Sequence, residues 1–229
     1  MCKLILIETS TALCSTALVI DGKIACTRES SMQHAHASMT TPFIKEMLDE
    51  KGMRVQDFDA VCLSSGPGSY TGLRVGSSTA KGLCFAAGIP LVSVGTLELL
   101  VHQAAANGLS GDCRYVIPMI DARRMEVYTA VFNPDGTRVS EIEPKVIDPE
   151  SFRAELEEGK VLFIGDGAAK CKDTINHANA CFVQTYPHAS AMLKPAMREF
   201  EAGNFQDTAY FEPFYLKQFV ATISKKNLF

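Results

Sequence analysis

The chain has 229 residues, of which 47% are hydrophobic and 21% charged, and its formal net charge is -4 at pH 7. The length permits one large domain or two small ones, and the negative charge argues against autonomous binding of nucleic acid, which needs a basic face. No two of the eight cysteines form a Cys-x-x-Cys pair, so neither a zinc knuckle nor a redox pair is indicated. No segment approaches the roughly 20 apolar residues of a membrane span. We therefore expect a soluble, reduced, cytoplasmic protein.

The first part of the chain predicts an antiparallel unit followed by alternating helices and strands. Asp21-Gly22 between two apolar runs is a strong two-residue hairpin signal, and Gly52 and Gly88 suit the ends of helices. The expected strands cover residues 3–7, 15–20, 23–30, 60–64 and 91–94. The expected helices run from Ser38 or Thr41 to Gly52, over 71–87, and over 96–107.

The same order of elements restarts after residues 108–113, in a less regular form. The expected strands cover residues 115–120, 126–132, 137–142, 161–164 and 181–183. The expected helices start at Asp148-Pro149, after Gly165-Asp166-Gly167, and at Ala189, the last of these running to Phe200. Two units of this kind predict an α/β fold with two lobes, residues 1–110 and 111–229. The first lobe has a mixed five-stranded sheet, and the second is reduced.

A glycine-rich turn, Ser65 to Gly76, connects a buried strand to a helix. Such a turn aims backbone N–H groups and the positive end of a helix dipole at one point, which suits an anion. The turn lacks the Lys of a Walker loop and the Gly-x-Gly-x-x-Gly spacing, and its glycines also suit close helix packing, which we favour. The residues that we consider for anion or nucleotide binding are Glu8, Ser10, Gly66, Gly68, Ser69 and Thr71.

The same turn carries a family resemblance. Ser65-Gly66-Pro67-Gly68-Ser69-Tyr70-Thr71-Gly72-Leu73-Arg74-Val75-Gly76 resembles the signature of the TsaB family, also called YeaZ. Glu8-Thr9-Ser10, His36-Ala37-Ser38, Val94 to Glu98 and Ile120 to Tyr128 resemble further family segments. The resemblance is firm over residues 1–132 and faint afterwards.

The resemblance implies a two-lobed fold of the actin, Hsp70 and sugar-kinase (ASKHA) superfamily. It also implies an accessory subunit of the machinery that makes threonylcarbamoyladenosine at adenosine 37 of tRNA. In that family the chain is a catalytically silent paralogue of TsaD, which it scaffolds, and it helps recruit the ATPase TsaE. ATP and a divalent metal are then expected on those partner subunits, with no cofactor on this chain, and tRNA is contacted indirectly through the complex.

The residues themselves give one argument that the chain has no catalytic activity of its own. Metal-dependent relatives carry His-x-x-x-His on a helix, and the matching positions here are Thr96 and Leu100. His102 has no second histidine at helical spacing, and the pair His34 and His36 is interpreted as loop imidazoles. Glu8 is one methylene longer than the Asp of true ATPases. We therefore predict no catalytic residue and no metal ligand, although an ATP-dependent kinase or carbamoyltransferase of the superfamily is the alternative.

Apolar and small residues on the first two helices suggest a surface for a partner. Such groups permit adaptable contacts and close approach of another helix. A homodimer of the isolated chain is expected through the same surface, and Met47→Glu or Gly76→Leu would then block assembly with TsaD. The alternative is that both stripes cover the sheet of their own lobe. The predicted contact residues are Met39, Phe43, Met47, Gly72, Gly76 and Ala80.

Two charged segments keep open interpretations. The cluster from Asp121 to Glu126 is either a solvated hairpin or part of the junction between the lobes. Lys217, Lys225 and Lys226 give the C-terminal segment some positive character, which is a weak signal for tRNA phosphates.

Overall fold

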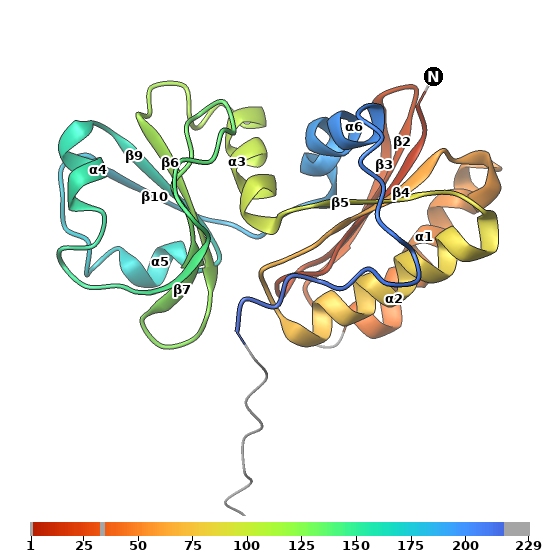
Figure 1. Ribbon diagram of the computed structural model, residues 1–229, viewed down its shortest axis with the longest axis horizontal. Helices are drawn as coiled ribbons and strands as arrows, with labels where there is room; N and C mark the ends of the chain where they lie inside the picture. The colour runs from red at the N-terminus through yellow and green to blue at the C-terminus, as the bar shows by residue number, and fades with distance from the viewer. Residues whose placement is uncertain (1, 33–34, 218–229) are drawn as a thin grey trace, which may run out of the picture.

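A computed structural model describes residues 2–32 and 35–217 of the chain (Figure 1). The first lobe is built on a mixed five-stranded sheet with the order β3-β2-β1-β4-β5, as predicted. β1 pairs with β2 in the antiparallel direction and with β4 in the parallel direction. The strands are β1 (Leu4–Glu8), β2 (Cys14–Ile20), β3 (Lys23–Ser30), β4 (Ala60–Ser64) and β5 (Leu91–Val94). The helices on one face are α1 (Ala35–Lys51), the short η1 (Val55–Asp57) and α2 (Tyr70–Ala87).

The second lobe repeats this plan with the order β10-β9-β6-β7-β8. The prediction of a reduced second lobe holds for its helices, because α4 and α5 have only six and four residues. It does not hold for the strands, because the second sheet also has five of them. The strands are β6 (Tyr115–Asp121), β7 (Glu126–Thr129), β8 (Glu143–Val146), β9 (Val161–Gly165) and β10 (Ala180–Gln184). The helices are α3 (Thr96–Ala106), α4 (Arg153–Glu158) and α5 (Ala168–Cys171).

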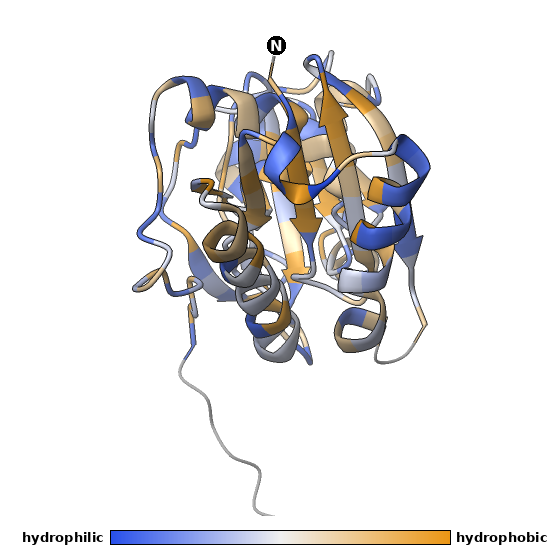
Figure 2. Ribbon diagram, turned by 90° about the vertical axis from the view of Figure 1, so that its right-hand side faces the viewer, coloured by the Kyte–Doolittle hydropathy of each residue, from blue (hydrophilic) through white to orange (hydrophobic). Residues whose placement is uncertain are grey.

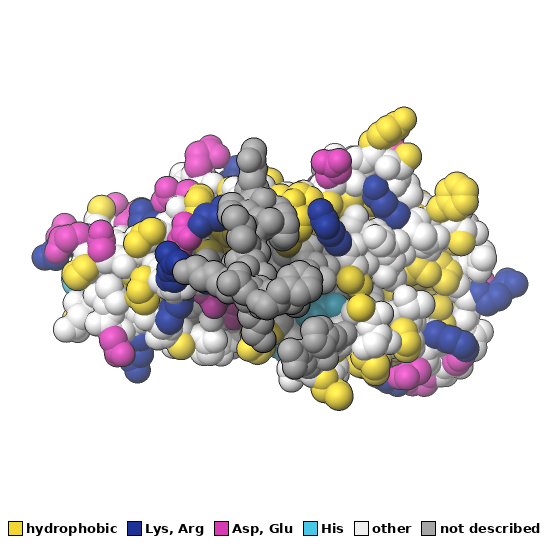
Figure 3. All heavy atoms as spheres, turned by 90° about the horizontal axis from the view of Figure 1, so that it is seen from below, with side chains coloured by type: hydrophobic (Ala, Val, Ile, Leu, Met, Phe, Trp, Pro, Cys, Tyr) yellow, Lys and Arg dark blue, Asp and Glu magenta, His cyan; other side chains and the backbone are white. Residues whose placement is uncertain are grey.

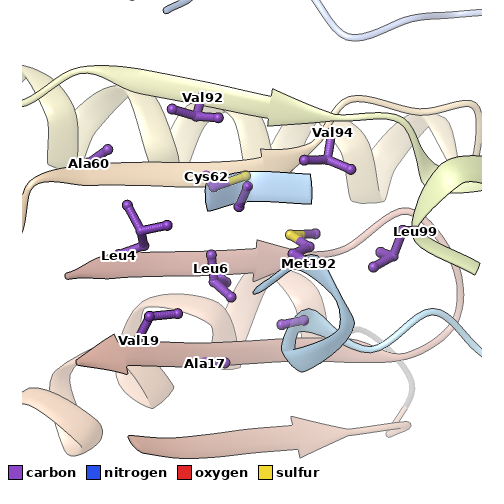
Figure 4. Close-up of a cluster of buried hydrophobic side chains, with 12 residues drawn as sticks. Leu4, Leu6, Ala17, Val19, Ala60, Cys62, Val92, Val94, Leu99 and Met192 are labelled. Atoms are coloured by element: carbon purple, nitrogen blue, oxygen red, sulfur yellow. The ribbon is translucent and has the colours of Figure 1, made fainter. Parts of the chain in front are cut away.

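The core of the first lobe has two layers, one on each face of the sheet. β1 is apolar on both faces because Leu4 and Leu6 point to one layer and Ile5 and Ile7 to the other. The second of these layers lies under α1 and α2. The first is closed by η2 (Ala189–Met192) and α6 (Leu193–Glu201), and Figure 4 shows Met192 beside Leu6. Figure 2 shows this lobe with mostly hydrophobic strands and helices of mixed hydropathy.

Two segments pack against the sheet formed by the other half of the chain. α3 covers the second sheet, where Leu97 and Leu100 join Val116 and Ile164 in one buried cluster. α6 returns to the first sheet, so the chain crosses between the lobes before α3 and again before η2. The predicted division at residue 110 assigns α3 to the first lobe and α6 to the second, whereas each of these helices packs on the sheet of the other lobe.

After α6, residues 203–217 form what we call the C-terminal strap (Figure 1). The strap runs along β5 and α2 and is held by the hydrogen bonds Gln206 N to Leu91 O (2.8 Å) and Phe214 N to Ser65 O (2.7 Å). It therefore ties the end of the described chain to the first lobe.

The second lobe departs from the predicted elements in several places. The sequence did not predict β8 (Glu143–Val146), and β7 ends at Thr129 rather than at residue 132. The expected strand at 137–142 is wrong, because this segment makes one isolated bridge, Phe132 to Arg138, and no continuous ladder. The helix expected at Pro149 starts at Arg153. Asp148 Oδ1 accepts hydrogen bonds from Glu150 N (3.0 Å) and Ser151 Oγ (2.8 Å), and this local turn takes the place of the first helical turn.

A candidate site between the lobes

A cleft of about 910 Å³ lies between the two lobes. Its walls come from the loop after β1, the start of α2, the β6–β7 turn and the end of β9. Figure 3 views the molecule from below, with Lys and Arg side chains and a histidine along the junction of the lobes. The lining includes Ser10, Thr11, His36, Gly68, Ser69, Tyr70, Thr71, Asp121, Arg123, Arg124, Glu126, Tyr128, Asp166 and Lys217.

A buried acid lies at the end of β1, beside the first wall of the cleft. Glu8 is fully buried, and its Oε1 accepts hydrogen bonds from Ser10 N (2.6 Å) and Ser10 Oγ (2.5 Å). Its Oε2 has no hydrogen-bond partner among the described residues. Burial raises the pKa of Glu8 from 4.5 to about 7, although the bonds from Ser10 oppose the rise. Glu8 therefore carries a proton for much of the time near neutral pH.

The glycine-rich turn packs directly on the β1–β2 loop. A Cβ at Gly68 would collide with the Ser10 carbonyl, and one at Gly72 with the Thr9 carbonyl. Ser69 caps α2: its Oγ accepts from Gly72 N (3.3 Å), and its own N–H donates to Ser10 O (2.6 Å). These contacts fix the positive end of the α2 dipole at the wall of the cleft.

The second lobe contributes a further acid to the cleft, directly after β9. Asp166 lies between Gly165 and Gly167, and its Oδ1 accepts a hydrogen bond from Asp121 N (2.9 Å). Burial raises the pKa of Asp166 from 3.8 to about 6, against the effect of this hydrogen bond. A Cβ at Gly165 would collide with the Met119 carbonyl, so this glycine lets β9 approach β6 closely.

The charge cluster at residues 121–126 forms the β6–β7 turn at the cleft. Arg123 (φ +70°) and Arg124 (φ +51°) both adopt the left-handed backbone conformation, which costs a non-glycine residue about 1–2 kcal/mol. Asp121 holds the turn by accepting from Arg123 N (2.8 Å), and it forms an ion pair with Lys170. Glu126 forms an ion pair with Lys217 of the strap. The cluster therefore belongs to the junction of the lobes.

Aromatic rings meet at the start of α2. Tyr70 stacks on Tyr215 of the strap, with ring centroids 4.1 Å apart, and the Arg74 guanidinium lies 4.7 Å from the Tyr70 centroid. With the ion pair between Lys217 and Glu126, this stack makes the end of the strap a link between the two lobes.

Of the six residues considered for anion binding, Ser10, Gly68, Ser69 and Thr71 line the cleft. The other two do not. Glu8 lies buried behind the wall, and Gly66 faces the strap, where a Cβ would lie 2.7 Å from Phe214 O.

The residues at the positions of the superfamily histidines are part of the packed interior. Thr96 and Leu100 are fully buried, and Leu100 is in the cluster under α3. His102 lies 3.5 Å from Glu98, which pairs with Arg198 at 2.8 Å, so this histidine belongs to a contact between α3 and α6. Within residues 2–32 and 35–217, no three His, Cys, Asp or Glu side chains gather as a metal site would require.

Only one histidine of the pair His34 and His36 lies within the described residues. The interpretation of His36 as a loop residue is wrong, because His36 is in the first turn of α1. It lines the cleft, and its buried Nε2 makes no hydrogen bond within the described ranges. His34 lies outside the described residues, as do Lys225 and Lys226.

The predicted partner-binding residues need a correction, because most of them face their own lobe. Met47 and Ala80 are fully buried, and Phe43 is 7% exposed. Gly72 and Gly76 are buried against Thr9, so Gly76→Leu would disrupt the fold rather than an interface. Met39 is half-buried. Helical periodicity marks these residues as apolar-facing, but it does not say whose surface they face.

The outer face of α2 is a better candidate surface. Phe85 is 88% exposed, and Ser78 and Gly82 are exposed on the same side of the helix. A Cβ at Gly82 would meet no heavy atom of the described chain within 4 Å. Nothing inside the lobe therefore accounts for this glycine, although glycine in a helix is less favourable than alanine by about 1 kcal/mol.

Among the cleft residues that sequence reasoning did not place there are Asp166, Tyr70 and Lys217. Asp166 follows a buried strand and lies between two glycines, and this placement was the signal that could have found it. Tyr70 is within the family signature, but its stacking partner is 145 residues later, at Tyr215. The sequence shows Lys217 only as part of a weakly positive C-terminal segment, and no local pattern reveals that it pairs with Glu126.

Comparisons with known proteins agree with the two-lobed architecture. Residues 29–225 match the model of the TsaD family, described as tRNA N6-adenosine threonylcarbamoyltransferase. The tRNA threonylcarbamoyladenosine biosynthesis protein TsaB of Haemophilus influenzae is 30% identical, with 93% of each chain covered. That of Escherichia coli K12 is 29% identical, with 96% of each covered. The solved structure of YeaZ from Pseudomonas aeruginosa is 27% identical, has a TM-score of 0.80, and covers 94% of this chain and 100% of its own.

Proposed function

The chain belongs to the TsaB family, and from this premise we propose that it is a non-catalytic subunit of the machinery that makes threonylcarbamoyladenosine in tRNA. The observation that carries the proposal is the match to TsaB proteins over 93% or more of both chains. In this proposal the chain scaffolds a TsaD-like paralogue, helps recruit a TsaE-like ATPase, and acts in the cytoplasm. ATP and a divalent metal are held by those partners, and tRNA is reached through the complex. No helix in the described part of the chain is long and apolar enough to span a membrane.

The non-catalytic role is supported by the packing around α3. A metal-ligating pair at positions 96 and 100 would need two imidazoles at an open site. Thr96 and Leu100 are instead fully buried, and Leu100 belongs to the same buried cluster as Val116 and Ile164 in the core of the second lobe. An enzyme of the superfamily is the alternative, and it predicts turnover of ATP by the isolated chain. We expect no turnover above that of a buffer control, and a rate that saturates with ATP would contradict the proposal.

We propose that the TsaD-like partner docks on the outer face of α2. Phe85 offers a large exposed apolar side chain, of the kind that acts as an anchor in interfaces. Gly82 leaves open space beside it, which permits close approach of a helix. In the absence of the partner, a second copy of the chain is expected to use the same face, because the apolar side chain remains uncovered.

Co-elution with the TsaD-like protein of the same genome tests this docking face. Phe85→Glu and Gly82→Leu are expected to abolish co-elution while the melting temperature stays within about 3 °C of the parent value, since both positions are exposed. Gly82→Ala is the matched control, because a methyl group adds little bulk, and it is expected to co-elute. Sedimentation of the isolated chain is expected to show a dimer that Phe85→Glu converts to monomer. Unchanged co-elution and sedimentation of Phe85→Glu and Gly82→Leu would refute this face.

A further inference from the structure

The second passage of the chain between the lobes is held firmly. The chain returns from β10 to the first lobe at residues 185–188, and Gln103 of α3 is hydrogen-bonded to this segment. Gln103 is 5% exposed; its Nε2 donates to Tyr186 O (2.9 Å), and its Oε1 accepts from His188 N (3.0 Å). Breaking these bonds would leave buried polar groups without partners, which is costly. We therefore expect this crossover to keep its conformation when the lobes move.

The first lobe holds the same crossover from the other side. Glu29 Oε1 of β3 lies 2.7 Å from His188 Nδ1, and the same oxygen accepts a hydrogen bond from Ser15 Oγ (2.7 Å). Ser15 Oγ in turn accepts from Ala189 N (2.9 Å). Side chains from both lobes thus converge on one short segment, which makes this crossover the point about which the lobes can turn.

The end of the strap joins the lobes once more, at the cleft, and it does so through side chains. Tyr215 stacks on Tyr70 of the first lobe, and Lys217 pairs with Glu126 of the second. Tyr70, Glu126 and Lys217 line the cleft, and in Figure 1 the end of the strap lies below the crossover. The strap also has hydrogen bonds to the first lobe, at Gln206, Ala209 and Phe214. The ion pair of Lys217 therefore connects a segment fixed on the first lobe to the second lobe.

This contact is weaker than the crossover. The side chains of Lys217 and Glu126 are 43% and 21% exposed, so water and dissolved ions screen their attraction. Gln103, by contrast, is buried and hydrogen-bonded at both ends of its amide group. A force that separates the lobes would thus break the contact of the strap first and leave the crossover intact.

We infer that the end of the strap is a releasable latch, which sets how far the cleft between the lobes opens about the crossover at residues 185–188. When Lys217 is paired with Glu126, the lobes keep the separation seen in the structure. When the pair is broken, the second lobe turns about the crossover and the two walls of the cleft move apart. Ionic strength shifts this balance, because dissolved ions screen an exposed pair. The inference concerns the isolated chain and does not rest on the proposed function.

Amide hydrogen exchange of the full chain tests the latch. Lys217→Met and Glu126→Gln each remove one charge of the pair and keep a side chain of similar length. Both are expected to speed exchange by about threefold or more at residues 9–12 and 166–168, which lie on opposite walls of the cleft. The double variant is expected to match the single variants, because either change breaks the same contact. Lys172→Met, at an exposed lysine that does not line the cleft, is the matched control and keeps the parent rates. Parent rates at both walls in the double variant would overturn the inference, and so would additive effects of the two changes.

A tryptophan placed in the cleft gives an independent measurement, because the chain has none of its own. Tyr128 lines the cleft and is half-buried, so the fluorescence of Tyr128→Trp reports how readily acrylamide enters the cleft. Raising NaCl from about 0.05 to about 0.5 M is expected to increase quenching by about twofold. The same increase is expected at low salt when Lys217→Met is added, and salt then has no further effect. Quenching that responds to neither change, or a salt effect that persists in Lys217→Met, would contradict the latch.

Discussion

Replacement of the buried acid Glu8 by glutamine should change how stability depends on pH. The folded chain holds the Glu8 proton up to about pH 7, whereas an unfolded glutamate loses its proton near pH 4.5. Between these values the unfolded state binds fewer protons, so the free energy of unfolding falls as the pH rises, and above pH 7 the loss is complete. At about 1.4 kcal/mol per pKa unit, the difference between pKa values of 4.5 and 7 corresponds to a loss of roughly 3 kcal/mol in the free energy of unfolding.

Glutamine cannot ionise, and its carbonyl oxygen can still accept both hydrogen bonds from Ser10. Urea unfolding of the parent chain between pH 4.5 and 8 is expected to show this decline, to which Asp166 adds in the same direction because burial raises its pKa from 3.8 to about 6. In Glu8→Gln the Asp166 contribution remains and the Glu8 contribution is lost, so roughly half the decline disappears. Glu141→Gln, at an exposed position, is the control and keeps the parent slope. If the free energy of unfolding of Glu8→Gln depends on pH as steeply as that of the parent chain, Glu8 does not retain its proton in the folded state.

Three shorter predictions follow from the packing. Gly72→Ala places a methyl group against the Thr9 carbonyl and is expected to lower the free energy of unfolding by about 3 kcal/mol, as measured by urea titration, and parent-like stability would contradict this contact. Burial raises the pKa of the Cys84 and Cys171 thiols to about 11, so both should resist alkylation by iodoacetamide at pH 8 until the chain is unfolded, and rapid labelling in the native state would show that they are accessible. Tyr215→Ala removes the stack on the start of α2 and is expected to speed amide hydrogen exchange at residues 70–74, whereas unchanged exchange would show that the strap does not hold the helix start.

The sequence predicts much of the fold because its signals are local. Continuous apolar runs, the Asp21-Gly22 turn and the helix-ending glycines Gly52 and Gly88 lead to most elements of both lobes within a few residues. The failures have local causes too: Asp148 forms a side-chain turn in place of the first helical turn, and residues 137–142 lack a continuous neighbouring strand.

The contacts between distant segments could not be predicted in the same way. Periodicity shows that Met47 and Ala80 face apolar surroundings, but the choice between a partner and the chain's own sheet depends on the whole fold. The residues of α6 form a helix as expected, yet this helix packs on the first sheet, which no local pattern specifies. The cleft combines strand ends that sequence reasoning found with Tyr215 and Lys217, which reach it through the path of the strap.

The central claim is that this TsaB-family chain supports tRNA modification without performing the chemistry. Reconstitution with the TsaD-like and TsaE-like proteins of the same genome, tRNA, ATP and the threonylcarbamoyl donor tests it most directly, with threonylcarbamoyladenosine quantified by mass spectrometry. Product is expected with the complete set, to be lost when this chain is omitted or replaced by Phe85→Glu, and to be absent when the chain replaces its TsaD-like partner. Full product without this chain, or product from this chain in the absence of that partner, would contradict the account.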